Sequence, residues 1–209
     1  MLKRLFDIQC ATLGLLVLSP LFLMISAIIG TTSPGGIFFR QERIGRDGRV
    51  FFLNKFRTML SDKNNQTKGF DLGHSERVTT VGSFLRKTKL DELPQLWNVL
   101  IGDMSLVGPR PEVIYWVNEF PTRWIVIHKI RPGITDEASI QFRNEEKILA
   151  DSLNPESYYR EVILPRKLDL AEHYADSHTF LGDLSILSRS LWAVITGGKS
   201  KENKSGSAL

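Results

Sequence analysis

The sequence predicts an α+β fold, in which a re-entrant membrane helix hairpin leads into a β-hairpin and a mainly helical cytoplasmic domain with interfacial amphipathic helices. Three observations predict it: an uncharged apolar segment near the N-terminus, a two-residue turn between short extended runs, and apolar residues at helical spacing later in the chain. The 209 residues, 42% of them hydrophobic, suffice for one packed domain. We expect a membrane helix over residues 1–30, a catalytic domain over 31–196 and a disordered tail over 197–209.

The segment from Ile8 to Ile29 carries no charge. At about 1.5 Å per residue it is long enough for a helix to cross the roughly 30 Å core of a bilayer. We expect Pro20 to break this helix, with the Ser19 hydroxyl satisfying freed backbone groups. Basic residues on both sides place both ends in the cytoplasm by the positive-inside rule. A re-entrant hairpin satisfies both features, and a kinked helix that crosses once is almost equally favoured.

Residues 37–44 and 49–57 predict two strands, because Asp47-Gly48 between them is a strong hairpin signal. Lys55 and Arg57 on this hairpin are candidates for phosphate binding, although each also suits contact with lipid headgroups. Residues 61–75 are polar and aperiodic, which predicts a mobile loop over the site. A short helix over 79–88 is expected to bring Arg86 towards the following carboxylates.

A second helix is expected to begin near Leu90 or Asp91, because Pro94 is tolerated only in the first turn. Gly102 is expected to end it. The buried stripe of this helix is predicted to comprise Leu93, Leu96, Trp97 and Leu100.

The stretch from Arg86 to Pro111 contains the residues best suited to chemistry. Asp91 and Glu92 point about 100° apart on a helix, so they can flank one reacting atom but cannot perform the same task. The prolines beside Arg110 make a stiff loop that holds this arginine in place, and its planar guanidinium suits the binding of phosphate. Together these residues indicate a carboxylate that acts, with a metal, on a phosphoryl group. Taken alone, the stretch fits a capped helix with solvated charges at better than even odds.

The C-terminal half is predicted to be helical. Helices over 113–120 and 122–130 carry Trp116 and Trp124, which suit a membrane interface or core packing equally well. Asn154-Pro155 predicts the start of a further helix. The last helix is predicted to be amphipathic, with Asp183 and Arg189 opposite an apolar stripe that comprises Phe180, Leu184, Leu187, Leu191 and Val194. We expect it to lie on the membrane or to close the core.

The charge balance and cysteine content limit the possible partners. With 27 Lys and Arg against 23 Asp and Glu, the formal net charge of +4 suits anionic lipid or phosphate ligands and does not indicate nucleic acid. The single cysteine, Cys10, excludes a disulfide framework and a thiolate metal site.

Six motifs in order resemble the bacterial sugar transferases, the monotopic polyprenyl-phosphate phosphoglycosyl transferases, and the likeness runs from about Leu2 to Ile195. The motifs are Gln41-Glu42-Arg43, Lys55-Phe56-Arg57-Thr58-Met59, Leu90-Asp91-Glu92-Leu93-Pro94-Gln95-Leu96, Gly102-Asp103-Met104-Ser105, Val107-Gly108-Pro109-Arg110-Pro111 and Arg131-Pro132-Gly133-Ile134-Thr135. The chain resembles the short catalytic-core form of the family, without extra N-terminal membrane helices.

This resemblance implies Mg²⁺-dependent, two-step transfer of a phosphosugar from a UDP-sugar to undecaprenyl phosphate, which releases UMP. It implies that Asp91 attacks phosphorus, that Glu92 holds the metal together with Asp91, and that Ser19-Pro20 breaks a re-entrant helix. It also implies a place in the bacterial inner membrane, with the catalytic domain facing the cytoplasm, at the first membrane step of a surface glycan pathway that downstream glycosyltransferases continue.

An ionised aspartate needs no general base to attack, and the resulting acyl phosphate is reactive enough to pass the group onward. Arg86 and Arg110 are expected to hold phosphate oxygens. Many members of the family continue after the threonine that corresponds to Thr135 with Gly-Trp-Ala-Gln-Val-Asn-Gly-Arg, and this chain departs from that run from Asp136 onward. Arg143 aligns with the arginine of the run and is therefore a candidate substrate contact.

Two alternatives remain open at this stage. In direct displacement both substrates bind together and Asp91 only holds metal. In the other, the chain is a non-catalytic membrane-anchored module that binds anionic lipid or a partner protein, although such a module needs no carboxylate pair among its cations.

Overall fold

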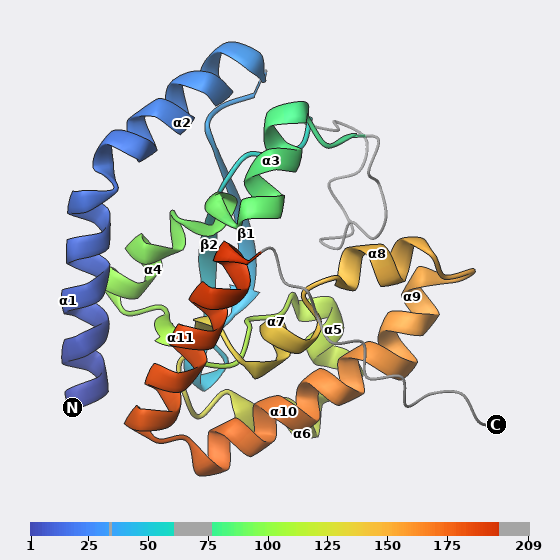
Figure 1. Ribbon diagram of the computed structural model, residues 1–209. Helices are drawn as coiled ribbons and strands as arrows, with labels where there is room; N and C mark the ends of the chain where they lie inside the picture. Colours follow the sequence, from blue (N-terminus) through green and yellow to red (C-terminus); the bar gives the residue numbers. More distant parts are fainter. Residues whose placement is uncertain (34, 61–76, 197–209) are drawn as a thin grey trace.

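The computed structural model describes residues 1–33, 35–60 and 77–196, so the predicted loop over 61–75 and the predicted tail over 197–209 lie outside the described residues. The described part is rich in helix and includes a small antiparallel β-hairpin. Helices α1 and α2 form one edge of the molecule, and α8 and α9 lie at the opposite edge (Figure 1).

The N-terminal apolar segment forms two helices, α1 (Leu2–Val17) and α2 (Ser19–Thr32), with a bend of 60° between them. Pro20 lies in the first turn of α2, where its missing N–H costs no hydrogen bond. The Ser19 hydroxyl donates to the Leu16 carbonyl at 2.8 Å. Within the described residues no single helix has both the length and the apolar composition to span a bilayer, whereas α1 and α2 together meet both criteria.

The first two turns of α1 bind the rest of the domain through polar contacts. Arg4 donates to the carbonyls of Val99 and Leu100 at 2.6 and 3.0 Å. Asp7 is buried and accepts hydrogen bonds from the Ser105 hydroxyl and the Leu106 amide. Beyond these two turns, the large apolar side chains of α1 and α2 that remain exposed are Leu13, Leu16, Val17, Leu23, Met24 and Ile28.

The predicted hairpin is confirmed. Strands β1 (Phe38–Ile44) and β2 (Val50–Phe56) pair antiparallel, with Phe38 opposite Phe56 and Ile44 opposite Val50. The turn is the 3₁₀ segment η1 (Arg46–Gly48), in which Asp47 takes the left-handed φ of 59° that aspartate tolerates better than most residues.

Three helical segments follow the hairpin: α3 (Thr80–Thr88), the 3₁₀ turn η3 (Leu90–Glu92) and α4 (Gln95–Ile101). The predicted α-helix start at Leu90 or Asp91 is therefore wrong, because η3 is a separate turn and α4 begins only after Pro94. Gly102, at φ 100°, ends α4 as predicted.

The predicted apolar stripe of α4 is also partly wrong. Trp97 is 53% exposed, whereas the buried residues of this helix are Gln95, Asn98 and Val99. The reason is tertiary, because α4 packs against β2 and Asn98 hydrogen-bonds across to it. The Asn98 side chain donates to the Phe52 carbonyl at 2.8 Å and accepts from the Asn54 amide at 3.1 Å.

Two short strands that the sequence did not predict, β3 (Ser105–Val107) and β4 (Gly133–Thr135), form a parallel pair. Val107 lies opposite Thr135. The two segments of backbone approach closely at Gly133, where a Cβ atom would lie 2.1 Å from the Gly108 nitrogen. This pair brings two basic, proline-containing motifs side by side.

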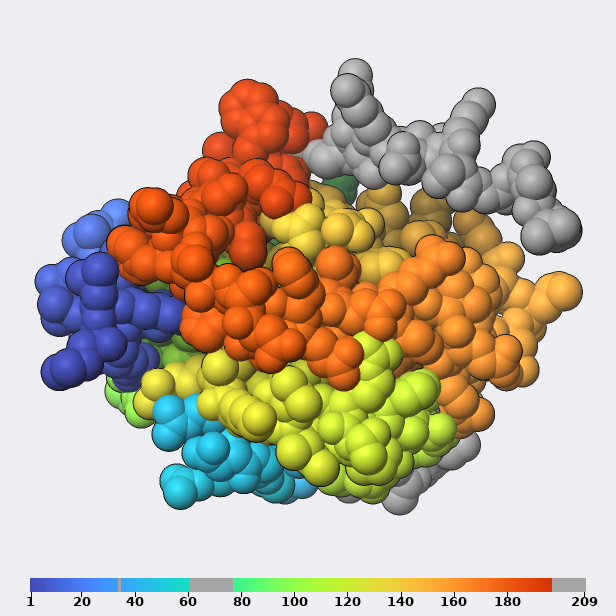
Figure 2. Space-filling model, turned by 90° about the horizontal axis from the view of Figure 1, so that it is seen from below, coloured from blue at the N-terminus to red at the C-terminus, as the bar shows by residue number. Residues whose placement is uncertain are grey.

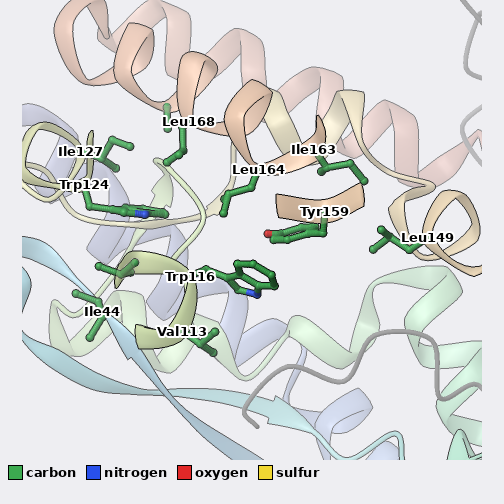
Figure 3. Close-up of a cluster of buried hydrophobic side chains, with 12 residues drawn as sticks. Ile44, Val113, Trp116, Trp124, Ile127, Leu149, Tyr159, Ile163, Leu164 and Leu168 are labelled. Carbon is green, nitrogen blue, oxygen red and sulfur yellow. The ribbon is translucent and has the colours of Figure 1, made fainter. Parts of the chain in front are cut away.

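Helices α5 (Ile114–Glu119) and α6 (Pro121–Ile127) confirm the prediction of two helices separated at Pro121. Trp116 is fully buried and Trp124 is nearly so, hence core packing is correct for both and the membrane-interface alternative is wrong. The Trp116 ring lies against Tyr159, with centroids 4.9 Å apart (Figure 3).

The remaining helices cover this core. They are α7 (Glu137–Gln141), α8 (Glu145–Ala150), α9 (Pro155–Tyr158), the π-helical turn η4 (Tyr159–Ile163) and α10 (Leu164–Ser177). The Asn154 side chain caps α9, which confirms the predicted helix start there. Helix α10 runs across the lower face of the molecule, next to α6 (Figure 2).

The last helix, α11 (Phe180–Ile195), differs from its prediction. Its one buried residue is Asp183, which was expected on the polar face, while Leu191 of the predicted apolar stripe is 62% exposed. Asp183 is drawn inward because it pairs with Lys3 at 2.5 Å and accepts a hydrogen bond from the Tyr174 hydroxyl. The ion pair of Lys3 with Asp183, together with the contact of Phe180 with Phe6 at 5.4 Å between ring centroids, thus places α11 against the domain.

Candidate functional site

The turn η3 places two adjacent carboxylates inside the domain. Asp91 and Glu92 are 6% and 8% exposed, respectively. Lys89 precedes them in the left-handed conformation, at φ 60°, and so turns the chain sharply between α3 and η3. Burial of charged groups is costly unless they are paired, so the surroundings of each carboxylate indicate its role.

Glu92 is paired with two cations from distant parts of the chain. Arg110 donates to both of its oxygens, at 2.7 and 3.4 Å, and Lys55 of β2 donates to one of them at 3.1 Å. Burial by itself raises the pKa of Glu92, but the charges of Arg110 and Lys55 outweigh it and hold that pKa well below its ordinary value. Glu92 is therefore a carboxylate at neutral pH.

Asp91 has a different environment. Its Oδ1 atom is buried and has no hydrogen-bond partner within the described part of the chain. Burial raises the pKa of Asp91 above its ordinary value; Lys55 acts in the opposite direction, and Glu92 adds to the rise. One carboxylate of the pair is thus neutralised by cations, and the other presents an unpaired oxygen.

The donor atoms of the carboxylate pair can be compared with those that a magnesium ion requires. Among the described residues no group of three or more His, Cys, Asp or Glu side chains is arranged as a complete metal site. Mg²⁺ typically needs only one or two protein carboxylates, because water and substrate phosphates supply the other oxygens. The unpaired Asp91 oxygen is the donor type that such an ion prefers.

Arg110 lies in a loop whose backbone is held from several sides. The Gly108 amide donates to the Thr135 carbonyl, and the Gly133 amide donates to the Pro109 carbonyl at 3.0 Å. Arg43 donates to the Pro111 carbonyl, also at 3.0 Å. The backbone is consequently held on both sides of Arg110, whose guanidinium binds Glu92.

A buried polar cluster that sequence reasoning did not single out lies behind this loop. Glu112 accepts hydrogen bonds from Tyr159 at 2.7 Å and from Arg43 at 3.2 Å. Burial, together with the nearby charge of Glu112, raises the pKa of Tyr159 well above the ordinary value. The only signal was positional, because Glu112 directly follows the proline loop and Arg43 belongs to one of the six motifs.

Three other residues predicted to contact the substrate form no hydrogen bond or ion pair with the carboxylate pair within the described part of the chain. Arg86 forms an ion pair with Glu146 at 2.8 Å, and Arg57 donates to the Phe38 carbonyl. Arg143 lies between α7 and α8, with no ion pair to a described residue. Their roles towards a substrate stay predictions, whereas Lys55 and Arg110 meet at Glu92.

Comparison with known proteins decides what this site belongs to. A family model described as bacterial sugar transferase matches residues 1–197. The chain belongs to the bacterial sugar transferase family. The resemblance carried by the six motifs is therefore confirmed over the whole described chain.

Three relatives show the range of this family. A UDP-glucose:undecaprenyl-phosphate glucose-1-phosphate transferase of Escherichia coli (strain K12) is 43% identical over 67% of this chain and 31% of its own length. A UDP-N-acetylgalactosamine-undecaprenyl-phosphate N-acetylgalactosaminephosphotransferase of Aeromonas hydrophila is 40% identical over 66% of this chain and 34% of its own length. The exopolysaccharide production protein ExoY of Sinorhizobium fredii is 34% identical over 92% of this chain and 84% of its own length.

The alignment thus spans about a third of the length of the first two relatives and most of the third. The first two relatives are named as sugar-phosphate transferases that use undecaprenyl phosphate, and the third is named as a protein of exopolysaccharide production.

Proposed function

We propose that the chain transfers a phosphosugar from a UDP-sugar to undecaprenyl phosphate, giving undecaprenyl-diphosphate-sugar and UMP. The observation that carries this proposal is the pair Asp91-Glu92, in which one buried carboxylate keeps an unpaired oxygen while the other gathers Arg110 and Lys55. The names of the Escherichia coli and Aeromonas hydrophila relatives support the substrate classes.

In the first step, an Asp91 oxygen attacks the phosphorus that carries the sugar. The bond from that phosphorus to the bridging oxygen of the diphosphate breaks, and UMP leaves with this oxygen. Asp91 needs no proton acceptor, because an ionised carboxylate is already nucleophilic. The product is an aspartyl phosphosugar.

In the second step, a phosphate oxygen of undecaprenyl phosphate attacks the same phosphorus. The bond to Asp91 breaks, which restores the carboxylate and forms the lipid diphosphate sugar. Both steps place charge on oxygens around one phosphorus, so fixed cations beside it lower the barrier. Arg110 and Lys55 supply these cations in this chain.

Glu92, together with Asp91, would hold Mg²⁺, which when bound neutralises the diphosphate and the leaving UMP. The chain's own contribution is to keep Glu92 ionised. Its lowered pKa ensures this across the neutral range. Glu92 also keeps Arg110 and Lys55 beside Asp91, where the phosphates of the substrate must lie.

We also infer that α1 and α2 form a re-entrant pair in the bacterial inner membrane, with the domain on the cytoplasmic side. The 60° bend, the exposed apolar side chains and the polar contacts of Arg4 and Asp7 to the domain support this topology. The exposed apolar face of α11 is proposed to lie in the membrane interface. The lipid product would then be available to downstream glycosyltransferases of a surface glycan pathway.

Topology is tested with single cysteines, introduced as Leu2→Cys or Leu60→Cys into a Cys10→Ser background. A membrane-impermeant thiol reagent added to intact cells should label neither position, and the same reagent added to inverted vesicles should label both. Labelling of position 2 only from outside, with position 60 reachable only from inside, would show a helix that crosses once.

The chemistry is tested by intact-protein mass spectrometry of detergent-solubilised chain with Mg²⁺ and either UDP-glucose or UDP-N-acetylgalactosamine, without lipid acceptor. We expect a phosphosugar mass increase and UMP release for the wild type, and neither for Asp91→Asn. UMP that appears only after undecaprenyl phosphate is added, without an adduct, would favour direct displacement. No UMP across a broad panel of UDP-sugars with acceptor, together with binding to anionic vesicles, would favour the non-catalytic module.

A further inference from the structure

Asp136 connects the end of β4 to the loop that carries Arg110. It is a buried carboxylate, 6% exposed, and its two oxygens have different partners. Oδ2 accepts a hydrogen bond from the Arg110 backbone amide at 3.0 Å, and Oδ1 accepts one from the Ser139 amide at 2.6 Å. The second contact is the N-cap of α7, and the first is not required by any helix.

The position of Asp136 follows from the parallel pairing of β3 and β4. Val107 lies opposite Thr135, so the residues that follow each strand, Gly108 to Arg110 and Asp136, come together at the same end of the pair.

The Arg110 amide is the natural point at which to hold this loop. Pro109 and Pro111 have no N–H group, so Arg110 supplies the only backbone donor of the three residues. The carbonyls on each side are already bound, that of Pro109 by the Gly133 amide and that of Pro111 by Arg43. Asp136 thereby completes the set of contacts that fix the backbone of Arg110.

We propose that Asp136 is a positioning residue, which holds the Arg110 backbone so that the guanidinium stays aligned with Glu92 and with the substrate phosphates. This inference rests on the proposed function of Arg110. A backbone held at the amide limits the directions in which the long arginine side chain can extend, and small displacements of a phosphate-binding group cost much of its effect.

The test separates positioning from helix capping with the substitution Asp136→Ser. Serine is a good N-cap, so it keeps the bond to the Ser139 amide, but its single oxygen on a shorter side chain cannot also reach the Arg110 amide. A residue that only caps α7 would tolerate serine. The matched control is Asn154→Ala, which removes the side-chain cap of α9 and has no contact with the Arg110 loop.

The first readout does not depend on activity. Hydrogen exchange is measured in a peptide that covers residues 107–112, where Gly108 and Arg110 supply the only amides between Val107 and Glu112. We expect the Arg110 amide to exchange about tenfold faster or more in Asp136→Ser, and as in the wild type in Asn154→Ala. Unchanged exchange in Asp136→Ser would overturn the inference.

The second readout is kcat/KM for UMP release with Mg²⁺, undecaprenyl phosphate and the UDP-sugar that the adduct experiment identifies. We expect Asp136→Ser to lower kcat/KM about tenfold and to have no further effect in an Arg110→Ala background, because the two residues act as one unit. An equal effect of Asp136→Ser in both backgrounds would contradict positioning through Arg110. If Arg110→Ala alone left kcat/KM unchanged, the proposed role of Arg110 would be wrong, and the exchange result would still decide whether Asp136 holds the loop.

Discussion

Glu92 and Arg110 are joined through both carboxylate oxygens, at 2.7 and 3.4 Å, although they are 18 residues apart in the chain. This contact links the 3₁₀ turn that carries Asp91 to the proline loop. The proline loop is held by contacts from β4 and from Arg43, so the contact with Glu92 ties the 3₁₀ turn to a fixed part of the domain.

Replacement of Glu92 by Gln should destabilise the protein and abolish turnover. The substitution keeps the shape of the side chain but leaves Arg110 and Lys55 without their anion, which we expect to lower the free energy of unfolding by about 2–3 kcal/mol. The control is Glu146→Gln, which disrupts an ion pair whose Glu146 side chain is 74% exposed and should change stability by less than about 1 kcal/mol. Urea unfolding measures both, and equal losses would contradict the prediction.

The same pair predicts a pH dependence. Because the folded protein lowers the pKa of Glu92, the pair stabilises the native state at pH values above the pKa of this residue in the unfolded chain, about 4.3. This contribution should be lost only as pH falls through the lower native pKa. Urea unfolding between about pH 7 and pH 4 should therefore show a wild-type advantage over Glu92→Gln that persists through most of this range. An advantage already lost near pH 6 would contradict the assignment.

Asp91→Asn should be more stable than the wild type at neutral pH while it lacks activity. Burial raises the pKa of Asp91, so its ionised form is disfavoured in the folded state, and this cost is present at pH values above the native pKa. Thermal unfolding should give a higher Tm for Asp91→Asn at about pH 8, with a difference that shrinks as the pH is lowered and Asp91 becomes protonated. A lower Tm at every pH would show that the Asp91 charge is stabilised, not strained.

Gly133→Ala should disrupt the Arg110 loop. The new Cβ atom would lie 2.1 Å from the Gly108 nitrogen and 2.4 Å from its oxygen, and backbone atoms in a parallel strand pair cannot move aside without breaking the pair. We expect a loss of about 3 kcal/mol or more, or failure to fold. The control is Gly30→Ala in α2, where nothing lies within 4 Å and alanine favours the helix. Equal expression and Tm for both variants would argue against the close approach.

Asp7→Ala should loosen the attachment of α1. It leaves the Leu106 amide and the Ser105 hydroxyl without the buried carboxylate that accepts from them, which we expect to cost about 2–3 kcal/mol. Hydrogen exchange in α1 should rise at the same time. Asp176→Ala, at an exposed position on α10, should change neither quantity, and a similar effect of both substitutions would refute the attachment.

The elements that could be predicted from sequence are those whose determinants lie within a few residues. Asp47-Gly48 supplies the backbone freedom for the hairpin, Gly102 ends α4 through its left-handed φ, and Asn154 caps α9 with its own side chain. The motifs around Asp91 and Arg110 likewise indicated the family, because each motif consists of neighbouring residues and can be recognised without knowledge of the fold.

Other features depend on what the rest of the chain places against an element. Trp97 fits an apolar stripe by spacing but is exposed, since β2 meets α4 on the face of Asn98. Asp183 fits a polar face but is buried, because Lys3 comes from the other end of the chain to pair with it. Periodicity gives the faces of a helix, and the partner decides which of them is covered.

The sequence by itself therefore determined the family, the carboxylate pair and the turns, caps and stops that bound most elements. Only the tertiary structure decided that β3 pairs with β4, that Arg110 and Lys55 meet at Glu92, and that Asp136 holds the Arg110 amide. The physical reason is distance along the chain. A turn or cap depends on the φ preference and hydrogen bonds of neighbouring residues, whereas the charge environment of a buried carboxylate depends on segments that only folding brings together.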